Sequence, residues 1–250
     1  MDAAVLAGGW DPGADRIEAR IVGVGTELER MPWTRAAHGV ALEELASVRT
    51  FPVQRGRRIA PGWWWSSSTG RLVHYGFGAM RTQIMLLDHD PQVVGLACSP
   101  VELAWLGEES AVAVHAPHLM ARLRDGSGLL VDCVGGEGVP ARLADHAPAM
   151  AAAAGAVGWH YRIARPPDPV LVANVRWLSG YRHPRHGGSI PTGRVAGVFA
   201  QPLPLIEGAR RLGEPIEAWP AIFHALWSGV LGAPLDRPLH ERTVATGAAE

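Results

Sequence analysis

The chain contains no lysine, so all 23 of its Lys+Arg positions are arginine. An arginine-only set of basic residues is typical of a GC-rich genome, but the chemical consequence holds whatever its origin. Any mechanism that needs a lysine side chain from this chain is excluded. Arginine cannot replace lysine as a proton carrier, because its guanidinium stays protonated.

Cysteine and long apolar runs are also scarce. Two cysteines, Cys98 and Cys133, do not make a disulfide framework and favour a reducing compartment. No stretch approaches the roughly 20 apolar residues of a membrane span. The first 20 residues are interrupted by glycine, proline and acidic residues, unlike a signal peptide. We therefore expect a cytoplasmic protein without a membrane segment.

Charge of one sign is not in excess either. The formal net charge is −1, so contact with DNA would depend on a local basic patch. A hydrophobic share of 48% and a charged share of 19% are typical of a globular chain. The 250 residues suit one large domain or a core domain with a small appendage.

The central part of the chain has the pattern of a mixed α/β domain. Phe77, Met80, Ile84 and Leu87 have helical spacing and predict a helix over 77–87. Further helices are predicted over 41–48, 141–157 and 169–181. Short strands are predicted over 19–24, 93–98, 101–106, 111–114, 119–123, 128–133 and 159–163. This order predicts a mixed sheet, partly antiparallel through hairpins, flanked by helices.

Two further regions are read from their turn residues and periodicity. Residues 51–70 look like a loop, and three adjacent tryptophans, Trp63–Trp65, cannot all face one core. After a Gly/Pro-rich linker near 185–192, helices are predicted over 203–212 and 215–230, with a β-ribbon over 234–246. These could form a small winged-helix-like unit or a helical flank. The predicted domains are 1–45, 46–185 and 186–250.

The order of elements resembles the core of the PD-(D/E)XK, or restriction-endonuclease-like, nucleases. Several segments also resemble TnsA-like endonuclease subunits of heteromeric transposases: 55–66, 74–75, 85–95, 115–117, 124–132, 158–159 and 173–182. The resemblance covers roughly residues 45–185 and, more weakly, the C-terminal segment. No single segment is a strong motif, so their order and spacing carry the resemblance.

The resemblance implies a metal-dependent site for phosphodiester hydrolysis. The family has a helix glutamate, a hairpin aspartate, a strand acid and, two residues later, a lysine, and it uses Mg²⁺ or Mn²⁺. The corresponding positions here hold Gly76, His118, Asp132 and Val134. Only Asp132 keeps the expected chemistry, and one carboxylate with one imidazole is a poor Mg²⁺ site. We expect a degenerate site with no cofactor, or Mg²⁺ or Mn²⁺ if activity remains.

Asp132 and His118 are the only candidate metal ligands at these positions. Asp132 is either a leftover ligand or a strand-end carboxylate bonded to backbone N–H groups. His115 and His118 are three residues apart, and on one strand they would face opposite sides, which argues against a chelating pair.

Other ligand sets are also conceivable. The loop with His183 and His186 has metal-like spacing but no cysteine or carboxylate pair nearby. Glu102, Glu108 and Glu109 are candidates for relocated carboxylates. The serines at 66–68 have the pattern of a turn.

Two clusters are candidate DNA contacts, with ordinary surface arginine as the alternative. The first combines Arg55, Arg57 and Arg58 with Trp63–Trp65. The second combines Arg176, Arg182 and Arg185 with His186.

Three functions are compatible with these observations. The first is a non-catalytic TnsA-like protein of DNA recombination or transposition, which binds DNA or a transposase subunit of the integrase type. The second is an active metal-dependent endonuclease with relocated ligands. The third is a protein-interaction subunit with no DNA role. A homo-oligomer of the chain is compatible with each of them.

Overall fold

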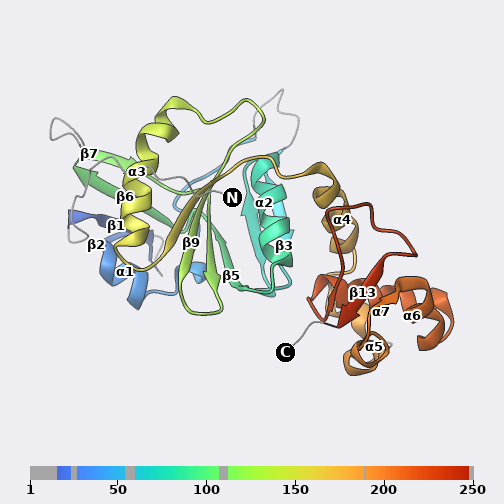
Figure 1. Ribbon diagram of the computed structural model, residues 1–250. Coiled ribbons are helices and arrows are strands. Elements are labelled where there is room, and N and C mark those ends of the chain that lie inside the picture. The colour runs from blue at the N-terminus through green and yellow to red at the C-terminus, as the bar shows by residue number, and fades with distance from the viewer. Residues whose placement is uncertain (1–15, 24–26, 54–59, 107–111, 189, 248–250) are drawn as a thin grey trace. The chain divides into compact units, whose positions relative to one another are not determined.

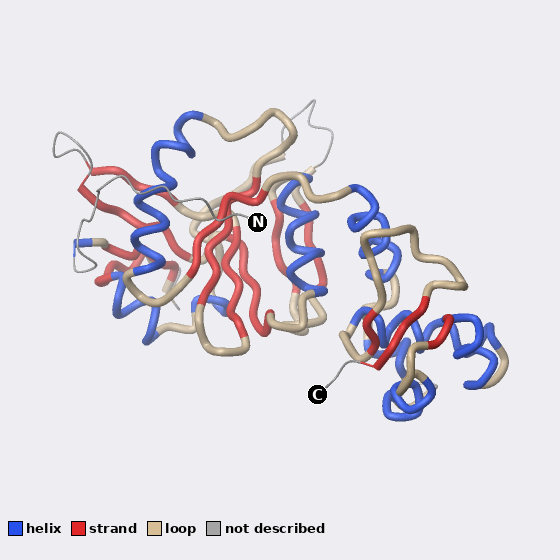
Figure 2. Tube along the Cα trace, viewed as in Figure 1, coloured by secondary structure: helices blue, strands red, loops and turns tan. Residues whose placement is uncertain are grey.

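The computed structural model describes residues 16–23, 27–53, 60–106, 112–188 and 190–247. The chain divides into two compact units. Unit 1 comprises Met1–Trp65, Leu72–Ile84 and Gln92–Pro166, and unit 2 comprises Ser66–Arg71, Met85–Pro91 and Pro167–Glu250. Most strands belong to unit 1, and Figures 1 and 2 show that most of them lie in the part of the chain before residue 167. The predicted boundary near residue 185 therefore differs from the contact-based one, which lies at 166/167.

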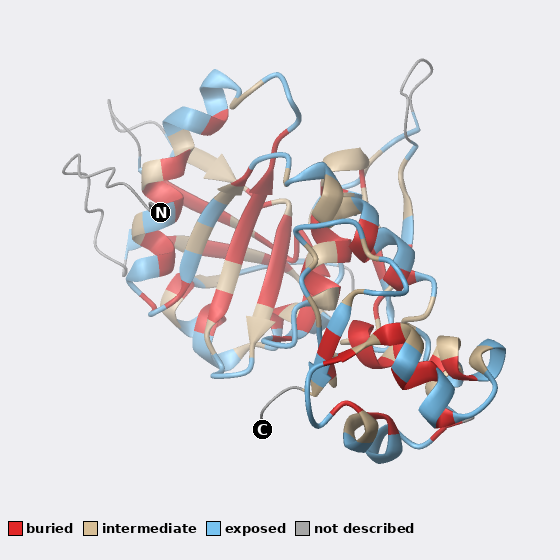
Figure 3. Cartoon of the chain, turned by 45° about the vertical axis from the view of Figure 1, so that its right-hand side comes forward, coloured by how far each residue is buried: buried red, intermediate tan, exposed pale blue. Residues whose placement is uncertain are grey.

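The main sheet of unit 1 has the strand order β10-β9-β8-β5. Its strands are β5 (Val93–Cys98), β8 (Leu119–Leu123), β9 (Gly128–Cys133) and β10 (His160–Ala164). β5, β8 and β9 pair antiparallel, whereas β9 and β10 are parallel and are connected through α3 (Ala141–Gly155). A parallel pair needs such a crossover, and α3 packs against both strands. Figure 3 shows long buried stretches along these strands.

A second sheet in unit 1 has the order β2-β1-β6-β7. Its strands are β1 (Glu18–Val22), β2 (Leu28–Pro32), β6 (Val101–Leu106) and β7 (Val112–His115). A separate hairpin, β3 (Gly62–Trp65) with β4 (Leu72–Tyr75), precedes α2 (Gly78–His89). The connection from β5 to β6 contains Ser99, whose φ of 39° lies in the left-handed region that side chains rarely adopt.

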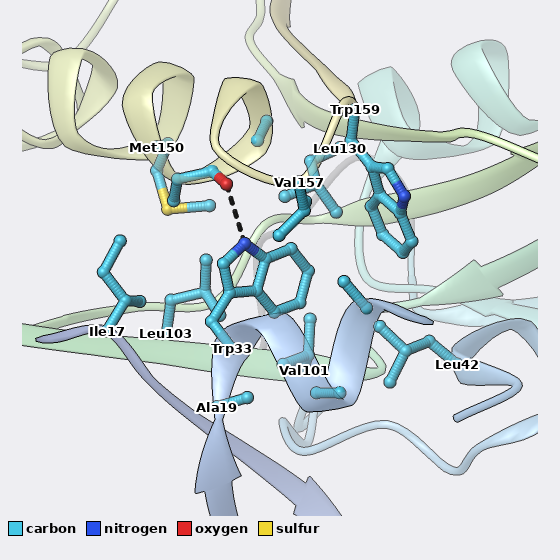
Figure 4. Packing of buried hydrophobic residues seen from close by; sticks show 14 of the residues in the cluster. Ile17, Ala19, Trp33, Leu42, Val101, Leu103, Leu130, Met150, Val157 and Trp159 are labelled. Atoms are coloured by element: carbon cyan, nitrogen blue, oxygen red, sulfur yellow. Dashed lines mark hydrogen bonds between the residues drawn. The ribbon is translucent and has the colours of Figure 1, made fainter. Parts of the chain in front are cut away.

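Short helices complete unit 1 and contribute to its core. They are α1 (Trp33–Gly39) and the 3₁₀ helix η2 (Leu42–Glu44). The Trp33 indole is fully buried and donates from Nε1 to the Ala153 carbonyl at 2.7 Å (Figure 4). Its ring meets Trp159 edge-on, with centroids 5.3 Å apart. Aromatic side chains bury large apolar areas, and an edge-on pair adds to the stability of the core. The buried N–H of the Trp33 indole keeps a hydrogen-bond partner in the Ala153 carbonyl.

Unit 2 is mainly helical. Its elements are α4 (Pro169–Ser179), η4 (Pro184–Gly187), α5 (Thr192–Val198), α6 (Leu205–Leu212), α7 (Pro215–Trp227) and the strands β11 (Leu203–Pro204), β12 (Leu231–Gly232) and β13 (Val244–Gly247). Asp168 caps α4 by accepting from the N–H groups of Val170 and Leu171 at 2.8 and 3.1 Å. Proline at the first helical position completes a favourable start.

The serine turn also belongs to unit 2, and the Asp88 carboxylate organises it. Asp88 Oδ1 accepts from Ser66 Oγ at 2.6 Å and from the Ser68 N–H at 3.0 Å, and Oδ2 accepts from the Ser67 N–H at 3.1 Å. Trp227 Nε1 donates to Ser67 Oγ at 2.7 Å. The serines therefore shape a turn, as their sequence pattern predicts.

The mixed α/β class is confirmed, and four strand predictions match the observed bounds: 93–98, 101–106, 119–123 and 128–133. The helix predicted over 41–48 is wrong, since only Leu42–Glu44 form a 3₁₀ turn and the helix lies earlier, at Trp33–Gly39. The loop predicted over 51–70 is wrong in part, because Gly62–Trp65 pair with β4.

The β-ribbon predicted over 234–246 is also wrong. Only Val244–Gly247 are extended, and they pair with β11 and β12 instead of with a neighbouring segment. The segment before Val244, which was predicted to form the other strand of the ribbon, is a loop. Asn174 holds this loop by accepting from the Leu239 N–H and by donating to the carbonyls of Leu235 and Arg237. Within the described residues, no helix has both the length and the apolar character to cross a membrane.

Candidate functional site

Strand register brings two of the predicted site residues together. β8 and β9 pair antiparallel with Leu119 opposite Val131, so one step further His118 lies opposite Asp132. On the other side, Tyr161 pairs with Leu130 in parallel register and therefore shares the face of Asp132. The sheet thus places one carboxylate between side chains from both neighbouring strands.

Asp132 is fully buried, and both of its carboxylate oxygens accept hydrogen bonds. Its Oδ2 lies 2.8 Å from His115 Nε2 and accepts from the Tyr161 hydroxyl at 2.9 Å. Its Oδ1 accepts from the His118 N–H at 3.3 Å and lies 3.0 Å from His118 Nδ1. Burial raises the pKa of this carboxyl, but the hydrogen bonds and charges of His115 and His118 outweigh it and hold the pKa well below its usual range. Asp132 is therefore held as an anion at neutral pH, with donors around both of its oxygens.

His118 has two possible partners for one ring nitrogen. The Cys133 N–H donates to Nδ1 at 2.9 Å, and the same nitrogen faces Asp132 Oδ1 at 3.0 Å. A neutral ring accepts from Cys133, whereas a protonated ring donates to Asp132, because one nitrogen cannot do both. The backbone carbonyl of His118 is also fixed, since it accepts from the Ser99 N–H at 3.0 Å.

The two histidines line a cavity of about 790 Å³ within unit 1. Its other walls come from the strand end at Cys133–Val134, the glycine-containing loop 135–139 and the amino end of α3. The Phe77 ring meets His118 edge-on at 5.1 Å. Arg49 and Arg142 add positive charge to the lining, and Glu137 is the acidic residue in it. The charged residues of the lining are therefore two arginines and one glutamate, and Arg49 also lies 3.5 Å from Glu102.

The other two predicted positions contribute no donor. Val134 lines the cavity with an apolar side chain that is 5% exposed. Gly76 lies beside Phe77 but is not part of the lining, and a Cβ built on it would overlap the Phe51 ring. The expectation that this position lies on a helix is wrong, because Gly76 lies between β4 and α2, and the space for a larger side chain there is filled by the Phe51 ring.

These residues do not fit a divalent metal ion. Mg²⁺ needs oxygen ligands that point into open space, whereas both oxygens of Asp132 already accept hydrogen bonds inside the core. Among the described residues, no group of three His, Cys, Asp or Glu side chains has the geometry to hold a metal. This includes the loop with His183 and His186, where His183 Nδ1 accepts from the Arg185 N–H at 3.2 Å.

The structure corrects one argument about the histidine pair. His115 ends β7 and His118 precedes β8, so the two do not share one strand, and both contact Asp132. The expectation that their rings face apart is wrong. Glu102 is not a relocated ligand, because it pairs with Arg20 at 3.4 Å and Arg49 at 3.5 Å.

The candidate DNA contacts divide between described and undescribed residues. Arg55, Arg57 and Arg58, like Glu108 and Glu109, lie outside the described residues. In β3, Trp64 is buried and Trp63 is 64% exposed, as strand alternation requires.

The second arginine cluster lies in unit 2, whereas the Asp132 site lies in unit 1. Arg176 belongs to the last turn of α4, Arg182 donates to the Ser179 carbonyl at 2.6 Å, and Arg185 lies in η4.

Sequence reasoning missed Tyr161 as a partner of Asp132, and it missed Arg49 and Arg142 in the lining. Tyr161 could have been found from the parallel register of β9 and β10. Arg49 lies in an irregular segment and carries no comparable signal. His146 of α3 was also missed: its ring meets His115 at 5.5 Å, its Nδ1 is buried without a partner among the described atoms, and burial lowers its pKa.

No protein-family model and no curated protein sequence matches this chain.

Proposed function

We propose that this chain is a TnsA-like, nuclease-fold protein that binds DNA without cutting it. In this proposal the former metal site binds a phosphate of the DNA backbone directly. The observation that carries the proposal is the environment of Asp132 in unit 1. A carboxylate remains there, but it is fully buried, and both of its oxygens lie within hydrogen-bond distance of His115, His118 or Tyr161.

The topology of the main sheet supports the fold assignment. The PD-(D/E)XK resemblance implies a helix, antiparallel strands, a second helix and a final strand parallel to its neighbour. α2, β5, β8, β9, α3 and β10 follow that order, with β6 and β7 inserted between β5 and β8. A winged-helix-like character of unit 2 stays a prediction, since its strands are only two to four residues long.

The electrostatics of the cavity support anion binding. Arg142 lines it together with the amino end of α3, whose first residues have no side-chain cap, and Arg49 lines it while lying 3.5 Å from Glu102. Free N–H groups at a helix start attract anions, and arginine donates two parallel hydrogen bonds to phosphate. A phosphate oxygen can therefore be held without a metal ion.

A DNA mobility assay in EDTA tests the binding half of the proposal. We expect duplex DNA to bind, with an affinity that falls as salt rises. Arg142→Ala should weaken binding on every sequence and reduce the slope of log K against log[salt] by about 1. Arg81→Ala, an exposed arginine of α2 outside the lining, is the matched control. Loss of DNA binding under all conditions would favour the protein-interaction function.

A nicking assay tests the non-catalytic half. Supercoiled plasmid should stay intact with Mg²⁺ or Mn²⁺, for the unaltered protein and for Asp132→Asn alike. Nicking that disappears in Asp132→Asn would establish the active endonuclease instead.

The resemblance also implies an integrase-type transposase subunit as partner, which predicts that a gene for such a transposase lies beside the gene for this chain.

A further inference from the structure

Unit 2 contains a second cavity, of about 450 Å³, between α4, α7 and the loop at 239–241. This volume lies in the range of sites that hold a small molecule or one chemical group of a larger ligand. Its lining residues are Ala173, Asn174, Trp177, Leu205, Trp219, Phe223, Leu239, His240 and Glu241.

Aromatic rings form one side of this cavity. Trp219 and Phe223, one turn apart on α7, are stacked with centroids 5.2 Å apart and planes at 19°. Trp177 of α4 meets Phe223 edge-on at 6.0 Å, and its side chain is 58% exposed. Tyr181 continues the aromatic row, 4.9 Å from Phe223. Large rings left open to solvent beside a cavity favour a planar ligand that stacks on them.

The opposite wall is held in place by Asn174, the only asparagine of the chain. Its Nδ2 donates to the carbonyls of Leu235 and Arg237 at 2.9 and 2.6 Å, and its Oδ1 accepts from the Leu239 N–H at 3.0 Å. Because these three hydrogen bonds fix the amide to the loop, Asn174 shapes the wall of the cavity. The other polar side chains of the lining are Glu241 and His240, whose Nδ1 accepts from the Arg242 N–H at 3.1 Å.

Positive charge follows the aromatic row along the chain. Residues 176–186 contain Arg176, Arg182, Arg185 and two histidines but no acidic residue. The ring of His186 meets Tyr181 at 5.4 Å, and Arg185 Nε donates to His186 Nε2 at 3.4 Å. Glu241 is the acidic residue of the lining, and a carboxylate there can accept from an exocyclic amino group of a base.

We propose that this cavity accepts one unpaired base of single-stranded DNA, with Trp177 and Trp219 as the stacking surface. Stacking rings with arginines close to them in the chain are the combination that binds unpaired strands, whereas an apolar peptide would gain nothing from the arginines. A paired base cannot enter, because its faces are covered in the duplex stack. This inference rests on the proposed DNA-binding function and specifies which form of DNA unit 2 takes.

The test measures the binding of the whole chain to a single-stranded oligonucleotide with one 2-aminopurine, whose fluorescence is quenched when the base stacks. We expect quenching on binding. Trp177→Ala should weaken single-strand binding about 5- to 150-fold, since each stacked base contributes about 1–3 kcal/mol, and should leave duplex affinity within twofold. Trp177→Phe should retain most of the affinity because it keeps a stacking ring.

Ile216→Ala is the matched control, because Ile216 is an 83% exposed apolar residue of α7 that is not part of the lining. Circular dichroism establishes that each variant is folded. Unchanged single-strand affinity in Trp177→Ala would overturn the inference. If duplex DNA binds and single strands do not, the inference fails and the proposed function stands. If no DNA binds, both fail.

Discussion

Replacing Asp132 with asparagine is the most informative single change in unit 1. The side chain is fully buried, and it accepts from His115, Tyr161 and the His118 N–H. Asparagine has the same shape, but one of its two terminal atoms is an NH₂ group that cannot accept. At least one buried donor therefore faces another donor, and the negative charge of the Asp132 side chain is lost.

The size of the effect follows from these contacts. A hydrogen bond to a charged group contributes about 1.5–3 kcal/mol, and removing one charge of a buried pair costs about 3–5 kcal/mol. We expect Asp132→Asn to lower the free energy of unfolding by about 3 kcal/mol at pH 7, allowing for the bonds that asparagine keeps. For a chain of this length, Tm should fall by roughly 6–12 °C.

The effect should depend on pH in one direction. The folded-state pKa of Asp132 lies below its usual range, because hydrogen bonds from His115 and His118 outweigh the effect of burial. A carboxyl with a lowered folded-state pKa contributes stability above its unfolded pKa of about 3.9 and loses that contribution as pH falls. The difference between the unaltered chain and Asp132→Asn should therefore be largest above about pH 5 and shrink toward pH 3.

Urea unfolding followed by tryptophan fluorescence at pH 7, 5 and 3 measures this difference. Asp145→Asn is the matched control, since it removes the same charge from an exposed position in unit 1 and should change stability by less than about 0.5 kcal/mol. Equal stability of the two variants, or a difference that persists unchanged to pH 3, would refute the role assigned to Asp132.

Three further predictions follow from other contacts. Gly76→Glu should not create a metal site and should lower Tm, because its side chain would overlap Phe51; Gly76→Glu combined with Phe51→Ala should recover part of the loss in the same thermal scan. Asp88→Ala should lower the free energy of unfolding by about 2–4 kcal/mol in urea titrations, since it removes the buried acceptor of the serine turn; a loss below about 1 kcal/mol would contradict that role. Cys98 and Cys133 should resist thiol reagents at pH 8 until urea is added, because burial raises the pKa of both thiols, that of Cys98 to about 11; rapid labelling of the native chain would contradict this.

The strands of the main sheet could be predicted because each is a short apolar run between turn residues. Gly128–Cys133, for example, is nearly all apolar and follows the turn at Asp125–Gly126. The helix at Trp33–Gly39 was missed because seven residues are too few to establish a period. The strand Gly62–Trp65 was missed because its only support is pairing with Leu72–Tyr75, which lies beyond a turn.

The sequence could predict the site only for residues that the pairing of neighbouring strands brings together. Asp132 and His118 meet because their strands are neighbours, so an antiparallel hairpin already places them opposite each other. His115 reaches Asp132 from a strand of the other sheet, and no local pattern reports how two sheets approach. The Phe51 ring beside Gly76 is likewise a consequence of tertiary packing.

The two units are interleaved along the chain, and this determines how they can be separated. Unit 2 takes Ser66–Arg71 and Met85–Pro91 from the middle of unit 1, so the backbone crosses between the units at 65/66, 71/72, 84/85, 91/92 and 166/167. A fragment that starts at Pro167 lacks the Ser67 hydroxyl that binds the Trp227 indole. A single cut in the chain therefore cannot separate either unit intact. For the same reason, neither a fusion at residue 167 nor one recombination event can transfer a complete unit to another protein.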